Sequence, residues 1–286
     1  MATVINGREI SDKYKLVMKD AISNIKGRKP GLAVIIAGDN PASQVYVGHK
    51  VKDCEFTGII SYKYELPKDV DSKELISLIK KLNNDKNIDG ILVQVPLPAH
   101  LDEKEILNTI NPSKDVDGFG IESAGLLSLG TPKFIACTPL GVIKMLQYFN
   151  IDMNGKNAVV IGRSNIVGKP MAQLLLMNNS TVTICHSRTK DIKSFTRNAD
   201  ILIVAIGKAK FITREFVKAG AVVVDVGMNK LDGKLCGDVD YDDVFDTAGY
   251  LTPVPGGVGL MTRAMLLYNT IKAYEAHESV KIPLSF

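Results

Sequence analysis

Short apolar runs rich in β-branched residues alternate with longer amphipathic stretches along most of the chain. A parallel strand is covered on both faces and reads as a continuous apolar run, so this pattern predicts βα units around parallel sheet, an α/β fold. The expected strands are residues 32–36, 62–66 (alternating, hence an edge strand), 90–95, 157–162, 181–185, 201–205 and 221–226. Between the second and third of these, Asp71 is placed to cap an amphipathic helix.

A second helix has a clear start signal at Asn40 and Pro41, a capping residue followed by proline at the first helical position. We expect this helix to run to about Thr57. Tyr46 and Lys50 are four residues apart, so they share one face of it.

The apolar runs beyond residue 150 read as a fresh set of βα units, and 286 residues favour about two domains. We therefore expect a first domain over residues 1–145 and a second over 146–262. The final amphipathic stretch, 263–286, is expected to pack back on the first domain and complete it.

Composition narrows the function classes. The net charge of +4 is too small to argue for a nucleic-acid partner, and the longest apolar runs fall short of the roughly 18 residues of a membrane span. Cys54, Cys137, Cys185 and Cys236 lie far apart with no C-x-x-C, which argues against a metal site or a disulfide framework. We expect a cytoplasmic protein with neither nucleic acid nor membrane as partner and no bound metal.

A glycine-rich turn, residues 162–170, follows one predicted strand and opens a helix. Backbone N–H groups at such a helix start can face a pyrophosphate, so the context favours a dinucleotide site. The spacing departs from G-x-G-x-x-G, because Ser164 replaces the second glycine and one extra residue precedes Gly168. A plain strand-to-helix turn is the alternative.

The end of the next strand bears on which dinucleotide would bind. A site for NAD usually carries Asp or Glu there, whereas this strand ends in Cys185-His186-Ser187-Arg188. Arg163, Ser187 and Arg188 form a cationic, hydrogen-bonding set suited to a 2′-phosphate, which favours NADP over NAD. Arginines that only face solvent are the alternative, and the residues leave NAD open.

Several other segments could carry chemistry, although each has a plain structural reading. Tyr46 and Lys50 could belong to a partly exposed helix face, and the acidic turn at 115–119 could be turn chemistry alone. Gln94 ends a buried strand at the sheet edge where α/β proteins place ligands. The glycine-rich loop at 252–259 could let a ligand approach the backbone closely.

Five segments in this order span nearly the whole chain: Tyr46-Val47-Gly48-His49-Lys50, Gln94-Val95-Pro96-Leu97-Pro98, Asp115-Val116-Asp117-Gly118-Phe119, Gly162-Arg163-Ser164-Asn165-Ile166-Val167-Gly168-Lys169-Pro170 and Pro253-Val254-Pro255-Gly256-Gly257-Val258-Gly259. Together they resemble the bifunctional methylenetetrahydrofolate dehydrogenase/cyclohydrolase family, called FolD in bacteria. The resemblance implies an N-terminal βα catalytic domain and a C-terminal Rossmann-type NADP-binding domain with a cleft between them. It also implies a homodimer formed through the cofactor domain, acting on small tetrahydrofolate one-carbon derivatives.

The activity implied by the resemblance is oxidation of 5,10-methylenetetrahydrofolate to the 5,10-methenyl form with NADP, followed by hydrolysis to 10-formyltetrahydrofolate. In it Lys50 is the catalytic lysine of the hydrolysis, Tyr46 stacks on the aminobenzoate ring, Gln94 hydrogen-bonds Lys50, and Asp117 binds the amino edge of the pterin. The folate pocket would further include Val93, Val95, Pro255, Gly256, Gly257, Val258 and Gly259. The NADP contacts would be Gly162, Arg163, Ser164, Ser187, Arg188 and Met228.

The sequence departs from the pattern of the family at three positions near the expected folate pocket. Gly120 stands where many members have histidine, Leu260 where proline is common, and Arg263 follows three residues later. Two alternatives stay open: a dehydrogenase without hydrolase activity, against which Lys50 argues, and a non-catalytic NADP-binding protein. The four histidines are expected to face solvent or to act as caps.

Overall fold

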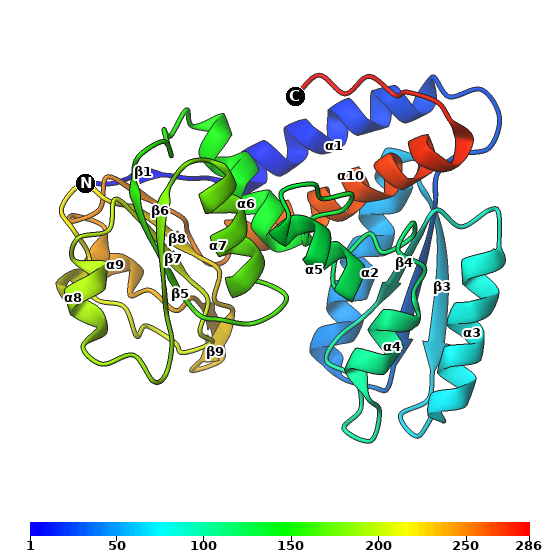
Figure 1. The fold of residues 1–286 in the computed structure, drawn as a ribbon, viewed down its shortest axis with the longest axis horizontal. Helices are drawn as coiled ribbons and strands as arrows, with labels where there is room; N and C mark the ends of the chain where they lie inside the picture. The colour runs from blue at the N-terminus through cyan, green and yellow to red at the C-terminus, as the bar shows by residue number, and fades with distance from the viewer. The chain divides into compact units, whose positions relative to one another are not determined.

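The computed structural model describes residues 1–286, the side chain of Ala42 excepted. The chain forms two compact units, each built on its own parallel sheet (Figure 1). Unit 1 consists of Met1–Ser11 and Thr138–Thr262, and unit 2 of Asp12–Cys137 and Arg263–Phe286. The α/β fold with two domains is therefore confirmed.

The sheet of unit 2 has the order β3-β2-β4, with β2 at Gly31–Ala37, β3 at Ile60–Leu66 and β4 at Gly90–Val93. β3 lies at an edge, as its alternating pattern predicts. β4 ends two residues earlier than expected: the N–H of Gln94 still donates to Ile35 at 2.8 Å, but Pro96 has no N–H with which to continue the pairing.

The helices of unit 2 are α2 (Pro41–Thr57), α3 (Ser72–Asn84), α4 (Glu103–Thr109), α5 (Ile121–Ser128), and most of α1 (Gly7–Ser23) and α10 (Val258–Glu278). The side chain of Asp71 accepts a hydrogen bond from the N–H of Lys73, which confirms the predicted cap of α3. Apolar residues of α3 and α4 pack with Ala33, Ile35 and Val93 of the sheet, and Figure 1 shows both helices beside it. Burial of this apolar surface is the main stabilising term.

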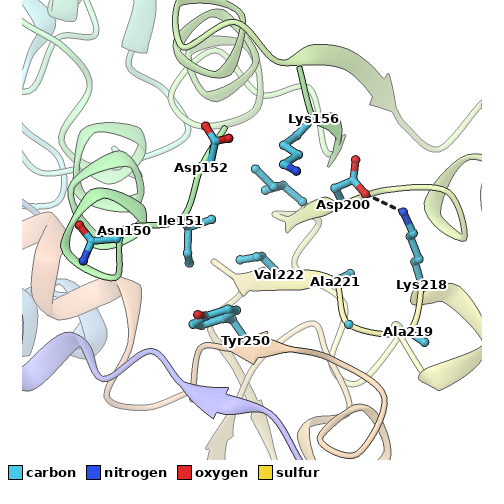
Figure 2. Close-up of a pocket in the computed structure, with 12 residues that line it drawn as sticks. Asn150, Ile151, Asp152, Lys156, Asp200, Lys218, Ala219, Ala221, Val222 and Tyr250 are labelled. Atoms are coloured by element: carbon cyan, nitrogen blue, oxygen red, sulfur yellow. Dashed lines mark hydrogen bonds and ion pairs between the residues drawn. The ribbon is translucent and has the colours of Figure 1, made fainter. Parts of the chain in front are cut away.

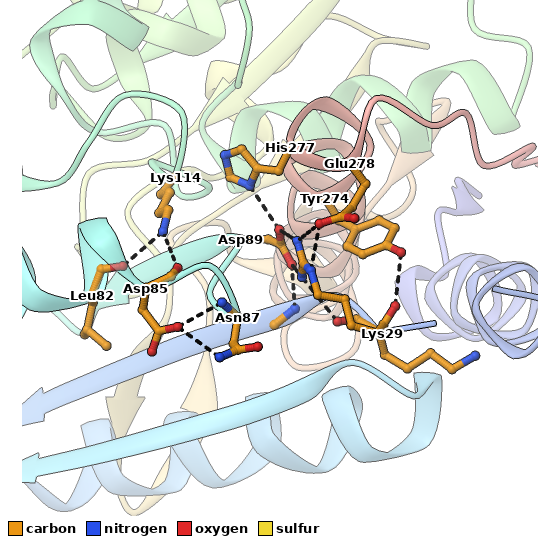
Figure 3. Close-up of polar contacts among 11 residues, drawn as sticks. Lys29, Leu82, Asp85, Asn87, Asp89, Lys114, Tyr274, His277 and Glu278 are labelled. Carbon is orange, nitrogen blue, oxygen red and sulfur yellow. Dashed lines mark hydrogen bonds and ion pairs between the residues drawn. The ribbon is translucent and has the colours of Figure 1, made fainter. Parts of the chain in front are cut away.

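One buried carboxylate ties three segments of unit 2 together (Figure 3). Asp89 precedes β4, is fully buried, and accepts two hydrogen bonds from the guanidinium of Arg28 at 2.7 and 2.8 Å. It also accepts one from the N–H of Gly31 at 2.9 Å, and His277 of α10 lies 3.0 Å away. His277 thus contacts a buried carboxylate, a role that the sequence did not indicate. The ring of Tyr274 lies against the same guanidinium, 4.8 Å from its carbon.

The buried ammonium of Lys114 closes the end of α3 in the same region (Figure 3). It donates to the carbonyl oxygens of Leu82 and Asp85 at 3.0 and 2.7 Å, so it adds a second donor to two carbonyls that also accept from the N–H groups of Asp85 and Ile88. Burial lowers the pKa of this amine.

The sheet of unit 1 is parallel throughout, in the order β1-β11-β8-β7-β5-β6. Its strands are β1 (Thr3–Val4), β5 (Asn157–Ile161), β6 (Thr181–Cys185), β7 (Ile201–Val204), β8 (Val222–Asp225) and β11 (Tyr250–Leu251). The chain leaves β5 toward β6 and returns to β7 on the other side of β5, so β5 and β7 flank the topological switch point. β9 (Asn229–Leu231) and β10 (Lys234–Cys236) form a separate antiparallel hairpin.

The helical segments of unit 1 are α6 (Cys137–Tyr148), α7 (Gly168–Met177), α8 (Ile192–Thr196), α9 (Tyr241–Val244) and the 3-10 turn Arg214–Phe216. The units divide between Cys137 and Thr138, whereas the sequence predicted a boundary near residue 145. Residues 1–11 also belong to unit 1 rather than to the expected first domain, because β1 pairs with β11. Within the described residues, no helix is both long and apolar enough to cross a membrane.

The Asp89 network leads to a stability prediction. Asp89→Asn removes the charge that the guanidinium of Arg28, the ring of His277 and a backbone N–H approach, and leaves Arg28 without its buried ionic partner. We expect a loss of about 3–5 kcal/mol in the free energy of unfolding, measured by urea denaturation followed by circular dichroism. The matched control is Glu278→Gln, since Glu278 pairs with the same guanidinium at 2.7 Å but is 39% exposed. That control should lose less than about 1 kcal/mol. Equal losses in the two variants would contradict the role assigned to Asp89.

Candidate active site

Lys50, Tyr46 and Gln94 come together in unit 2. Tyr46 and Lys50 project from one face of α2, and the Lys50 ammonium lies 5.5 Å from the centroid of the Tyr46 ring. Lys50 is only 7% exposed, and its Nζ donates to Oε1 of Gln94 at 3.1 Å. Gln94 follows β4 directly, and its Nε2 donates to the carbonyl of Val95 at 2.7 Å, which orients Oε1 toward the amine. The hydrogen bond from Lys50 to Gln94 thus links α2 to the carboxyl end of β4.

The environment of Lys50 favours the neutral amine more than water does. Burial lowers the pKa of Lys50, because a charged ammonium loses its hydration. Ionisable acids around it raise this pKa, and one guanidinium lowers it. These groups are Asp117, Cys137, Cys54 and Arg263. A lysine so placed holds its proton less tightly than one in solvent.

Asp117 lies beside Lys50, in a turn that Cys137 and Asn269 contact. Burial raises the pKa of Asp117, and the amine of Lys50 opposes that rise. Cys137 at the start of α6 places its Sγ 3.5 Å from Oδ1 of Asp117. Asn269 of α10 donates to the carbonyls of Val116 and Ile135 at 2.8 and 2.9 Å, so it holds the turn against the segment that leads to Cys137.

Sequence reasoning missed Cys137 and Asn269. The only signal for Cys137 was its place beside a proline-containing break, which served to mark a domain boundary. Asn269 carried no signal, because a single amide on an amphipathic helix has no local pattern.

The neighbouring Asp115 has a different role. Its carboxylate accepts hydrogen bonds from the N–H groups of Phe119 and Gly120 at 3.2 and 2.9 Å and from the hydroxyl of Ser123 at 2.6 Å. Asp115 is therefore used to shape the turn and the start of α5. A Cβ at Gly120 would lie 3.0 Å from this carboxylate, so a larger residue there would press on it.

The other residues expected at the folate pocket are divided between the units. Val93 is 1% exposed and its side chain belongs to the core of unit 2, while Val95 is half-buried against that core. Residues 255–259 belong to unit 1 and form the entry to α10. Gly257 is required there, because a Cβ would collide with the carbonyl of Pro253 at 2.5 Å. Pro255 is exposed.

The glycine-rich turn of unit 1 joins β5 to α7. Gly162 has φ +125°, and a Cβ there would overlap the carbonyl oxygen of Ala205 beyond β7. A Cβ at Gly168 would overlap the carbonyl of Gly162, so the first turn of α7 packs directly on the end of β5. The hydroxyl of Ser164 accepts from the N–H groups of Val167 and Gly168, both at 3.2 Å. Bare backbone at a helix start, at the switch point of a parallel sheet, is a fitting cradle for a pyrophosphate.

Three exposed polar residues lie at the same edge of this sheet. β6 pairs in register with β5, so Arg163 follows one strand while Ser187 and Arg188 follow its neighbour. The turn after β6 is held by His186, whose Nδ1 accepts from the N–H of Arg188 at 3.1 Å. Two guanidinium groups and a hydroxyl can thus reach an anion beyond the pyrophosphate position.

Two buried carboxylates hold the loops that follow β7 and β8. Asp238, which is fully buried, accepts from the N–H groups of residues 206–208 at distances of 2.7, 3.0 and 2.7 Å. Asp225 accepts from backbone N–H groups that include that of Gly227 at 2.9 Å, and burial raises its pKa to about 7. Met228 follows directly and is 53% exposed. These carboxylates were not singled out from the sequence, yet they set the shape of the edge from which Met228 projects.

A cavity of about 380 Å³ lies in unit 1 but away from this edge (Figure 2). Its lining residues precede or begin the strands, among them Lys156 before β5, Asp200 before β7 and Tyr250 in β11. The ion pair between Asp200 and Lys218, at 2.6 Å, crosses one side of it. Since the glycine-rich turn follows the carboxyl end of β5, this cavity belongs to the opposite end of the sheet.

Comparison with known proteins covers both units. Residues 5–117 match the model of the tetrahydrofolate dehydrogenase/cyclohydrolase catalytic domain. Residues 136–278 match that of the tetrahydrofolate dehydrogenase/cyclohydrolase NAD(P)-binding domain. The chain belongs to the tetrahydrofolate dehydrogenase/cyclohydrolase family. The five sequence segments that resemble this family therefore belong to a member of it.

Individual members of the tetrahydrofolate dehydrogenase/cyclohydrolase family match over nearly their full length. The bifunctional protein FolD of Lachnoclostridium phytofermentans is 54% identical over 274 residues, which cover 95% of this chain and 97% of the relative. The crystal structure of the bifunctional enzyme FolD from Campylobacter jejuni is 49% identical, with a TM-score of 0.95 and coverage of 96% and 99%. The FolD of Trypanosoma brucei, solved with NADP and an inhibitor, is 36% identical, with a TM-score of 0.92 and coverage of 96% and 98%.

Proposed function

We propose that this chain oxidises 5,10-methylenetetrahydrofolate to 5,10-methenyltetrahydrofolate with NADP and then hydrolyses that product to 10-formyltetrahydrofolate. The observation that carries the proposal is the buried Lys50 amine, hydrogen-bonded to Gln94 beside Tyr46 and Asp117. Unit 1 of the same chain adds the pyrophosphate cradle at Gly162. Family membership of both units supports pairing these two activities.

The groups around Lys50 suit the parts of a folate. The half-buried ring of Tyr46 offers a face on which an aminobenzoate ring can stack. Asp117 offers carboxylate oxygens that can accept hydrogen bonds from the amino edge of a pterin. We assign substrate binding to these two residues, with the backbone of residues 255–259 as a further contact.

For the oxidation, the chain contributes binding and orientation. NADP, when bound, accepts the hydride that leaves the methylene carbon. The backbone of the turn at 162–168 would hold the pyrophosphate, and Arg163, Ser187 and Arg188 the 2′-phosphate. Met228 stands at the loop held by Asp225, and we assign it to the nicotinamide half.

For the hydrolysis, Lys50 acts as the general base. Water adds to the methenyl carbon, and one proton of that water passes to Nζ of Lys50. The bond between the carbon and N5 then breaks, its electron pair goes to N5, and N5 takes the proton back from Lys50. The hydroxyl proton left on the former water leaves to solvent as the carbon–oxygen double bond of the formyl group forms. A free lysine has a pKa of about 10.4 and would hold its proton at neutral pH. Burial lowers the pKa of Lys50, and the positive charge of a bound methenyl substrate would lower it further. Gln94 accepts from the amine and keeps it oriented, which leaves its lone pair free to face the substrate.

The role of Lys50 is tested by Lys50→Met. We expect the hydrolysis of methenyltetrahydrofolate to fall to the uncatalysed rate while folate still binds, because the base is removed and the volume of the side chain is kept. The methenyl absorbance after mixing the variant with methylenetetrahydrofolate and NADP measures this: wild type gives a rise and then a fall.

The control is Lys52→Met, an exposed lysine on the same helix, which should behave as wild type. Normal hydrolysis by Lys50→Met would contradict the assignment. A rise without a fall in wild type would instead indicate a dehydrogenase alone, and a flat trace a non-catalytic NADP-binding protein.

The 2′-phosphate site is tested by Arg163→Ala and Arg188→Ala. A hydrogen bond to a charged group contributes about 1.5–3 kcal/mol, so each variant should raise the Kd for NADP by about 10-fold or more. The affinity for NAD, which lacks this phosphate, is the internal control and should change less than about 2-fold. Equal weakening of both cofactors, measured by fluorescence titration, would remove these residues from the 2′-phosphate site.

We also propose that the chain forms a homodimer through unit 1. β6 is an edge strand, and exposed apolar side chains surround it: Leu176 and Met177 of α7, Ile184 of β6, and Phe195 of α8. An open strand edge with exposed apolar residues favours pairing with a second chain. Ile184→Lys should therefore shift the mass measured by light scattering from dimer to monomer. Leu129→Lys, at an apolar position of unit 2 that is 78% exposed, should leave the dimer intact. A dimeric Ile184→Lys protein would contradict this interface.

A further inference from the structure

Arg263 is one of the positions at which the chain departs from its family pattern, and its side chain is 12% exposed. Its Nε lies 3.2 Å from Oδ2 of Asp53 on α2. Tyr46, Lys50 and Asp53 are spaced at i, i+4 and i+7, so they share one face of that helix. Arg263 therefore contacts the face of α2 that carries Tyr46 and Lys50.

The carboxylate of Asp53 is shared between two cations. Its Oδ1 lies 3.4 Å from Nζ of Lys15, whose amine also pairs with Asp12 at 2.9 Å. Its buried Oδ2 accepts no hydrogen bond from the described residues, so Asp53 attracts the guanidinium of Arg263 as an ion rather than through an aligned hydrogen bond. The single negative charge of Asp53 is thus shared between Lys15 and Arg263, and it does not neutralise both of them.

The charge of Arg263 acts on Lys50 and on Tyr46. The groups that face Lys50 come from every element around it: Asp117 from its turn, Cys137 from α6, Cys54 from α2 and Arg263 from α10. The carboxylate of Asp117 favours the protonated amine and Arg263 favours the neutral one, while burial raises the pKa of both thiols and keeps them uncharged. Arg263 also lowers the pKa of Tyr46, against the effect of burial.

We propose that Arg263 is a positioning residue for the hydrolytic step: anchored by Asp53, its guanidinium keeps positive charge beside the Lys50 amine and fixes α10 on the catalytic face of α2. This inference rests on the proposed function, since it assumes that Lys50 must accept a proton. An amine beside a fixed cation loses its own proton more readily, so it is available as a base at lower pH. The tethered cation opposes the effect of the Asp117 carboxylate, which favours the protonated amine.

The pH profile of hydrolysis tests the inference. Methenyltetrahydrofolate is supplied directly, without NADP, and kcat/KM is measured from pH 6 to 9 after subtraction of the uncatalysed rate. In Arg263→Gln the guanidinium is lost, the pKa of Lys50 rises, and the acidic limb should move to higher pH by about 0.5–1 unit. Arg263→Lys retains a cation and should keep the limb within about 0.2 unit of wild type. The circular dichroism spectrum and a cooperative urea unfolding transition, compared with wild type, report intact folding of unit 2 in each variant.

Arg263→Gln leaves Asp53 with one fewer cation, which destabilises the fold. A second variant therefore tests the inference if Arg263→Gln does not fold. The double change Asp53→Leu/Arg263→Met replaces the ion pair by apolar side chains, a change that proteins often tolerate. It should show the same upward movement of the acidic limb. An unmoved limb in either folded variant overturns the inference about Arg263 while leaving the role of Lys50 intact. Normal hydrolysis by Lys50→Met would overturn the proposed base itself, so the two failures are distinguishable.

Discussion

The candidate site depends on one contact, the hydrogen bond from a buried amine of α2 to an amide that follows β4. An ammonium taken out of water is unfavourable, so a lysine is seldom buried unless its surroundings compensate. Here Gln94 supplies a hydrogen-bond acceptor without a negative charge. Asp117 supplies a carboxylate, but burial raises the pKa of that carboxylate, which limits how strongly it stabilises the charged amine. The amine is held in place without being fixed in the charged state, which is what a general base requires.

Much of unit 2 can be understood as support for that contact. The turn that carries Asp117 is shaped by Asp115 from within and held by Asn269 from α10. Far from these groups, Asp89 ties the strands to the end of the same helix through His277. α10 thus takes part at both ends, and Arg263 brings its charge to the face of α2. α2 positions Tyr46 and Lys50, whereas Gln94 and Asp117 stand outside helices and strands in segments that hydrogen bonds hold, which limits their movement.

Unit 1 uses a different principle, because its cofactor edge is made mostly of backbone. Gly162 and Gly168 allow strand, loop and helix to approach more closely than any side chain would permit. Asp225 and Asp238 are buried and satisfied by backbone N–H groups, so they shape neighbouring loops. The phosphates of a dinucleotide can accept hydrogen bonds from backbone N–H groups, and its flat ring can lie on an open surface. Side-chain chemistry is concentrated in unit 2.

Local patterns in the sequence were sufficient for strands β2 to β8, for the Asp71 cap, and for the glycine turn after β5, because each depends on residues close together in the chain. The short strands β1, β9, β10 and β11 were not predicted. The motifs also picked out Tyr46, Lys50, Gln94 and Asp117, which the fold brings together. The tertiary structure adds the physical difference between Asp117 and Asp115: the Asp115 carboxylate accepts from backbone N–H groups and from Ser123, whereas Asp117 acts on Lys50. It alone decided the pairing of β1 with β11 and the partners of Cys137, Asn269, His277 and Arg263. Those contacts join residues far apart along the chain, and a single side chain without a periodic neighbour leaves no local pattern from which its partner can be inferred.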